Sequence, residues 1–169
     1  MSTSAGPFRP AREFIRPQYP HMLPNEKAIW DRFLLTTKMK FAWIRYDVKV
    51  GTGCPPPWAS EELIREALRL IEEDREPPKG AIELAIVKSA LSLTMLRIDA
   101  VARAEDGYWI FEVKPRAGRS ALGQLVSYGW WYHRMHPEHH PLYLACVCAE
   151  VDRNLEPIFA ERGIRVFVV

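Results

Sequence analysis

The amino-acid sequence predicts an α/β fold in which a central mixed β-sheet is flanked by helices. Two segments rich in β-branched and aromatic residues, 97–103 and 108–115, are separated by Glu105-Asp106-Gly107, which is a hairpin signal. After this hairpin, helical and strand-like patterns alternate to the end of the chain. Such alternation is typical of a sheet with right-handed crossover connections.

The composition is that of an ordinary globular protein. The chain has 169 residues, of which 48% are hydrophobic and 26% are charged, enough for one domain with a substantial core. The formal net charge of +2 excludes a polycation, so any nucleic-acid site has to come from local clusters of charge.

Residues 1–24 form a basic, proline-rich arm, and residues 25–169 are predicted to be a single α/β domain. The prolines of the arm exclude a long helix: Pro7, Pro10, Pro17, Pro20 and Pro24. Arg9, Arg12 and Arg16 make the arm basic. It is expected either to remain disordered, to pack along its own domain, or to bind a partner or phosphates.

The first half of the domain begins with a helix capped by Asn25, followed by a strand over residues 41–50. A second helix is expected to begin at Ser60 as its N-cap. Residues 81–93 fit both strand and helix, and part of this segment is predicted to be a strand because Ile82, Leu84 and Ile86 alternate. Further strands are expected over residues 142–148 and 164–169, with a short helix capped by Asn154 between them.

Cysteine usage and hydropathy predict a soluble, cytoplasmic protein with no membrane partner. The sequence has Cys54, Cys146 and Cys148, which we expect to be free thiols in a reducing compartment. Neither a signal peptide nor a long apolar run is present in the sequence.

Three charged residues interrupt the apolar strands of the hairpin: Asp99, Glu112 and Lys114. Glu112 and Lys114 share a face because side chains alternate along a strand, and Asp99 can lie beside Glu112 in an antiparallel pair. Two partly buried carboxylates repel each other, and a divalent cation such as Mg²⁺ relieves the repulsion. The alternative is a solvent-facing ion pair at a sheet edge.

In these residues the sequence resembles the PD-(D/E)XK nuclease superfamily. The pattern is an acid on one strand, Asp99, and Glu-x-Lys on the next, Glu112-Val113-Lys114. Gln124-x-x-x-Tyr128 on the following helix resembles the exonuclease-like branch. Ile98 stands where the family has its nominal proline. The resemblance covers roughly residues 94–169, and the Glu-Val-Lys-Pro form is also similar to some phage endonucleases.

The resemblance implies a DNase that depends on Mg²⁺ or Mn²⁺. Asp99 and Glu112 would bind the cation, together with the Val113 carbonyl and Glu26 of the first helix. For Glu26, an acid that simply complements the helix dipole is an equal alternative. Lys114 would position the attacking water. The competing hypothesis is an inactive nuclease-fold module that is a structural or nucleic-acid-binding part of a larger assembly.

Basic residues near this pattern predict contacts with DNA. Arg97 precedes Asp99 on the same strand, and Arg116 and Arg119 follow Lys114. Arginines at these positions can neutralise phosphates, although two loop arginines can also simply be solvated.

The helix over residues 120–135 is apolar on almost all sides, which favours core packing, then a homo-oligomer interface, then base stacking. Ser120 is its expected N-cap. Gln124 and Tyr128 share a face that we expect to reach the catalytic cluster, with Trp131 one turn further, while Leu122 and Val126 are expected to pack inward.

Four histidines follow in the sequence: His133, His136, His139 and His140. Only the first two have helix-like spacing, Pro137 and Pro141 interrupt the segment, and no cysteine lies nearby in the sequence. The spacing therefore does not favour a zinc site here.

Overall fold

The computed structural model describes residues 6–169, which divide into two compact units. One unit combines the described residues up to Val48 with Ile98–Val169, and the other is Lys49–Arg97. The single domain predicted over residues 25–169 stays a prediction, and the two units are described separately.

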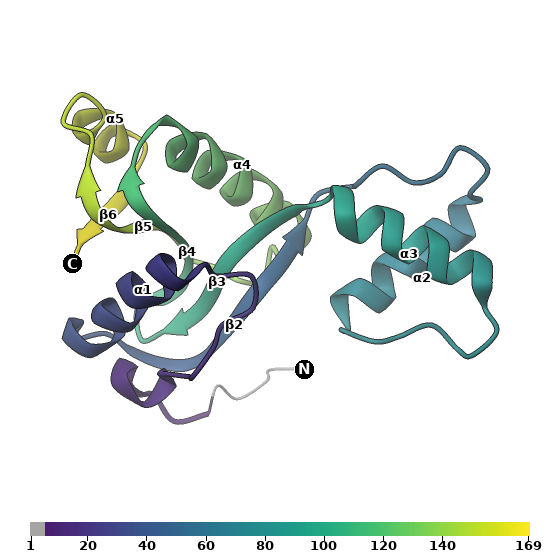
Figure 1. Ribbon diagram of the computed structural model, residues 1–169, viewed down its shortest axis with the longest axis horizontal. Helices are drawn as coiled ribbons and strands as arrows, with labels where there is room; N and C mark the ends of the chain where they lie inside the picture. The colour runs from purple at the N-terminus through teal and green to yellow at the C-terminus, as the bar shows by residue number, and fades with distance from the viewer. Residues whose placement is uncertain (1–5) are drawn as a thin grey trace. The chain divides into compact units, whose positions relative to one another are not determined.

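A six-stranded sheet, with its strands in sequence order from β1 to β6, forms the framework of the first unit (Figure 1). The strands are β1 Arg9–Pro10, β2 Lys40–Val50, β3 Leu96–Ala104, β4 Gly107–Ala117, β5 Leu142–Val151 and β6 Ile164–Val168. The β3–β4 pair is the predicted antiparallel hairpin, whereas β4, β5 and β6 run parallel. The predicted fold class, a mixed sheet with flanking helices, is therefore confirmed.

Two helices, α1 Pro24–Thr36 and α4 Arg119–Met135, pack against β4 and β5. In α1, Trp30 and Phe33 place their rings 5.2 and 5.4 Å from the ring of Phe111 on β4. Gly129 of α4 lies instead against Leu144 on β5, and a Cβ at this glycine would come within 3.0 Å of that side chain. Phe111 is paired with Ala145, and neighbouring residues alternate between faces, so the two helices cover opposite faces of the sheet.

The described part of the N-terminal arm, residues 6–24, packs along its own domain. A 3₁₀ helix, Ala11–Phe14, follows β1, and both of its end residues are buried. Tyr19 is also buried, and its hydroxyl donates a hydrogen bond of 2.6 Å to Asp31 of α1. Of the alternatives for the arm, packing along its own domain is therefore found over these residues, while residues 1–5 lie outside the described part of the chain.

The second unit contains two helices, α2 Glu61–Glu72 and α3 Ile82–Thr94. Ser60 caps α2 as predicted, since its hydroxyl accepts a hydrogen bond of 3.2 Å from the Leu63 amide. The prediction of a partial strand over residues 81–93 is wrong, because Val87 and Leu91, one helical turn apart, are fully buried against α2. Within residues 6–169, no helix is both long and apolar enough to cross a membrane.

Three predicted N-caps are wrong. Helix α1 has Leu23 as its N-cap and Pro24 in its first turn, so Asn25 lies inside the helix. Helix α4 has Gly118 as its N-cap, and Ser120 lies one residue inside. Helix α5 spans Glu156–Glu161 with Leu155 as its N-cap, and the preceding Asn154 donates hydrogen bonds to Asp152 instead. In α1, Pro24 fixes the start of the helix, because proline has no backbone N–H that would need an acceptor at that position.

Helix α4 buries a narrower stripe than its sequence suggested. Its buried residues are Ala121, Leu125, Tyr128 and Tyr132. Val126 is 41% exposed, so the prediction that Val126 packs inward is wrong. The reason is the angle of about 100° between successive helix residues, which turns Val126 away from the sheet when Leu125 faces it. The predicted oligomer through this helix stays a prediction.

The burial of Leu125 and the exposure of Val126 give a paired prediction. Leu125→Asp should unfold the first unit because it buries an unpaired charge, whereas Val126→Asp should lower the melting temperature by only a few degrees. Circular dichroism melts of the two variants would test this. A cooperative melt near the wild-type temperature for Leu125→Asp would contradict the helix orientation.

Candidate functional site

Asp99 and Glu112 lie side by side on β3 and β4. The register pairs Ala100 with Phe111, and its extension by one residue sets Asp99 opposite Glu112. The Oδ2 atom of Asp99 accepts a hydrogen bond of 2.8 Å from the Val113 amide. This contact holds the Asp99 carboxylate of β3 against β4, the strand that carries Glu112, at the end of the hairpin ladder.

Glu112 and Lys114 form an ion pair on the face of β4 that α4 covers. The distance between Lys114 Nζ and Glu112 Oε1 is 2.9 Å. Glu112 is 1% exposed, and among residues 6–169 it is the one charged side chain that is fully buried. Its second oxygen, Oε2, is buried without a hydrogen-bond partner in the described part of the chain. An unpartnered buried carboxylate oxygen is costly, which makes this atom a candidate ligand for a cation.

Burial and the neighbouring charges change the pKa values of all three groups. Burial raises the pKa of Glu112 to about 8, and the charge of Asp99 adds to the increase, although the Lys114 hydrogen bond opposes it. Burial also raises the pKa of Asp99, against the effects of the Val113 amide and Lys114. Burial alone would lower the pKa of Lys114, but the hydrogen bond and charge of Glu112 outweigh it, so that this pKa is raised. The cluster therefore attracts positive charge, either a proton or a metal ion.

Glu26 lies at the start of α1, where its charge contributes to the raised pKa values of both Asp99 and Glu112. Its Oε2 atom accepts a hydrogen bond of 3.0 Å from the Leu23 amide, so the side chain also caps its own helix. Both alternatives for Glu26, helix capping and support of a metal, are compatible with this position.

Gln124 and Tyr128 lie together on α4, the helix that packs against β4. The amide Nε2 of Gln124 donates a hydrogen bond of 3.2 Å to the Tyr128 hydroxyl. The carbonyl Oε1 of Gln124 is buried without a hydrogen-bond partner in residues 6–169, and Tyr128 is 4% exposed. The predicted action of Gln124 on Lys114 or on the substrate stays a prediction.

Gln124→Ala is expected to slow phosphodiester cleavage roughly ten- to a hundred-fold, which corresponds to about 1.4–2.7 kcal/mol. The reason is the buried Oε1, an acceptor that is available to Lys114 or to a water. Single-turnover kinetics on a fluorescent DNA would measure the effect. Ser127→Ala, an exposed change on the same helix, is the matched control and should cleave at the wild-type rate. Equal rates in both variants would contradict the assignment.

The predicted DNA-binding arginines have different surroundings. Arg116 lies near the end of β4 and forms ion pairs with Glu150 and Asp152, at 3.6 and 3.5 Å, although its side chain is 59% exposed. Arg119 is exposed in the first turn of α4. Arg97 belongs to the second unit. The carboxylates beside Arg116 reduce the positive charge available to a phosphate, so Arg119 is the more accessible cation.

Strand β5 also borders the cluster, although the sequence alone gives no signal for it. In the parallel ladder, Cys146 pairs with Glu112 and Cys148 pairs with Lys114. Both thiols are buried and unoxidised. Cys146 is therefore the neighbour of Glu112 on β5. This neighbour is identified by the register between β4 and β5, which cannot be read from the sequence alone.

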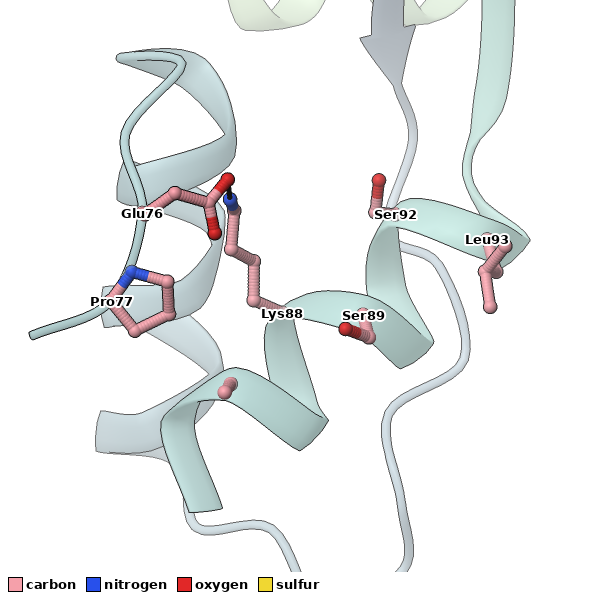
Figure 2. Close-up of a pocket in the computed structure, with 7 residues that line it drawn as sticks. Glu76, Pro77, Lys88, Ser89, Ser92 and Leu93 are labelled. Carbon is pink, nitrogen blue, oxygen red and sulfur yellow. Dashed lines mark hydrogen bonds and ion pairs between the residues drawn. The ribbon is translucent and has the colours of Figure 1, made fainter. Parts of the chain in front are cut away.

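A pocket in the second unit has no part in this cluster. It is lined by seven residues, none of which is a predicted site residue: Glu76, Pro77, Ala85, Lys88, Ser89, Ser92 and Leu93. Figure 2 shows Lys88 directed at Glu76, and the two form an ion pair of 2.9 Å. Lys88 and Glu76, the one lysine and the one acid of this pocket, pair with each other, so the pocket has no obvious catalytic group.

Comparison with known proteins gives little that bears on this site. No protein-family model matches the chain, and no curated protein does. Among solved structures, a repair endonuclease from Pyrococcus abyssi matches 69% of this chain, with 16% sequence identity and a TM-score of 0.35. The match covers 49% of that endonuclease, so the chain spans about half its length. A likeness this distant carries no argument about the activity.

Proposed function

We propose that this protein is a divalent-cation-dependent nuclease of the PD-(D/E)XK type that hydrolyses DNA phosphodiester bonds. The observation that supports it best is the cluster of Asp99, Glu112 and Lys114, in which Glu112 is fully buried and keeps one unpartnered oxygen. A surface ion pair would have both partners in solvent, whereas this acid is buried beside a second acid.

The residues of the cluster fit Mg²⁺ or Mn²⁺. Hard divalent cations bind carboxylate and carbonyl oxygens, which Asp99, Glu112 and the Val113 carbonyl would supply. Burial and the charge of Asp99 raise the pKa of Glu112, so its ionised form is stabilised by an added positive charge such as a cation. When bound, such a cation neutralises charge on the phosphodiester and favours ionisation of a nearby water.

The protein's own side chains would position the attacking water and bind the DNA. Lys114 remains protonated and is 27% exposed in its side chain, so its ammonium can hold the attacking water or a phosphate oxygen. Arg119, at the exposed start of α4, would bind the DNA backbone, where the unpaired amides of the helix N-terminus also favour phosphate. Tyr128 and Gln124 would form the wall of the site on the α4 side.

DNA cleavage with and without Mg²⁺ or Mn²⁺ tests the proposal. Linear, circular and branched DNA would be incubated with the wild type and with Asp99→Asn, which removes a charge but little volume. The wild type should cut at least one substrate only when the cation is present, and Asp99→Asn should not. DNA binding without cleavage on every substrate would favour the inactive structural module instead.

Asp99→Asn should also weaken Mn²⁺ binding at least tenfold, because one of the two negatively charged ligands is lost. Isothermal titration calorimetry would measure the affinities, and circular dichroism would check that the variant folds. Equal affinity in both proteins would remove Asp99 from the set of ligands.

A further inference from the structure

A second group of possible metal ligands lies just after the C-terminal end of α4. Nδ1 of His136 lies 3.6 Å from Glu138 Oε1, and Nε2 of His139 lies 3.7 Å from the same oxygen. All three atoms lie within 4.8 Å of one another. We propose that His136, Glu138 and His139 bind a transition-metal ion of the Zn²⁺ type, at a site separate from the nuclease cluster.

The spacing of the three atoms suits zinc. Ligands about 2.0–2.2 Å from a tetrahedral Zn²⁺ lie about 3.4 Å from one another. The two His–Glu distances exceed this by only a few tenths of an ångström, and the distance between the two imidazole nitrogens is at most 4.8 Å, which a side-chain rotation has to shorten. Two imidazoles and one carboxylate also form a ligand set that zinc uses when its fourth position is left open to water or to another group.

Neighbouring side chains hold the imidazole of His139 in place. The rings of His136 and His139 are nearly parallel, with centroids 5.2 Å apart and an interplanar angle of 12°, so the His136 ring has to rotate for both lone pairs to meet one ion. His139 also stacks on Tyr108, at 4.2 Å, and its Nδ1 lies 2.7 Å from the Tyr132 hydroxyl. When Nδ1–H donates to that hydroxyl, Nε2 presents its lone pair towards Glu138. A metal-binding histidine usually donates a hydrogen bond from its second ring nitrogen.

This group is far from the nuclease cluster. Tyr108, which stacks on His139, lies four residues before Glu112 on β4, about 13 Å along the strand. The two groups also flank opposite ends of α4, since Gly118 and Arg119 follow β4 directly while His136 ends the helix. The zinc proposal therefore does not depend on the proposed nuclease function.

The sequence does not favour this site, because only His133 and His136 have helix-like spacing. The structure pairs His136 with His139 across a turn, closed by a hydrogen bond of 3.0 Å from the His139 amide to the His136 carbonyl. The positive charges of Arg45 and Arg103 also act on His139 and oppose a cation, whereas Glu138 attracts one. We therefore expect micromolar affinity, an open fourth position, and a bound ion that stabilises the segment between α4 and β5.

Zinc binding to tag-free protein tests the proposal. Glu112→Gln would serve as the background, so that the nuclease cluster binds less metal. Equilibrium dialysis against Zn²⁺, with metal analysis, should give one ion per chain. In this background, His136→Gln should remove that ion, and Glu138→Gln should weaken its binding at least tenfold. Zn²⁺ should raise the melting temperature of the background but not that of His136→Gln.

His133→Gln and His140→Gln are the matched controls, because both histidines are exposed and lie outside the group. They should bind zinc as the background does. The side chain of Glu138 is 64% exposed, so Glu138→Gln should fold normally. If a histidine variant does not fold, zinc binding by Glu138→Gln still tests the proposed site. The absence of bound zinc at about 100 μM, well above a micromolar Kd, or equal affinity in Glu138→Gln and the controls, would overturn the proposal.

Discussion

Lys114→Ala should lower the rate of DNA cleavage by at least about a thousand-fold, or about 4 kcal/mol of transition-state stabilisation, while DNA and Mn²⁺ are still bound. The ammonium of Lys114 lies 2.9 Å from Glu112 and remains partly exposed, so it can contact both the carboxylates and an entering substrate. Its loss leaves the two acids in place to bind the cation. Single-turnover cleavage, DNA-binding anisotropy and Mn²⁺ calorimetry would separate the three effects.

Lys88→Ala provides the matched control. Lys88 is also a partly exposed lysine in an ion pair of 2.9 Å, with Glu76, but it belongs to the second unit and not to the cluster. It should cleave at the wild-type rate. Cleavage by Lys114→Ala within a few-fold of the control would show that Lys114 forms only an ion pair.

The cluster could be predicted because its causes are local. Side-chain alternation puts Glu112 and Lys114 on one face, and the turn at Glu105-Asp106 sets the register that places Asp99 opposite Glu112. Both rules need only the sequence of the hairpin. The burial of Glu112 was not predictable in the same way, since it depends on the pairing of β4 with β5 and on the packing of α4.

The errors arose where tertiary packing decides between similar local patterns. Ile82, Leu84 and Ile86 alternate as in a strand, but Val87 and Leu91 have a partner surface on α2, and the helix is formed. The division of the chain also depends on packing. Residues 49–97 contain a single aromatic residue, Trp58, but only their mutual contacts define them as a compact unit.

Glu112→Gln should abolish metal-dependent cleavage and, in the absence of metal, raise stability at alkaline pH. The pKa of Glu112 is about 8 in the folded protein, above its ordinary value of 4.5. The folded state thus binds this proton more tightly than the unfolded chain. The resulting stabilisation is complete below about pH 4.5 and is lost as the pH rises through about 8. In EDTA, the wild-type melting temperature should therefore fall between pH 6 and 9 by about 5 °C.

The side-chain amide introduced by Glu112→Gln cannot lose a proton in this range, yet it can still accept a hydrogen bond from Lys114 and donate one to Asp99. The variant should therefore lose this pH dependence and melt above the wild type at pH 8.5. Mn²⁺ should raise the melting temperature of the wild type but not that of Glu112→Gln, since the buried oxygen that lacks a partner is no longer anionic. Glu150→Gln, an exposed change on β5, should behave as the wild type in both experiments. A Glu112→Gln protein with the wild-type pH profile would show that Glu112 is ionised at neutral pH, and the case for a cation at this site would lose its electrostatic basis.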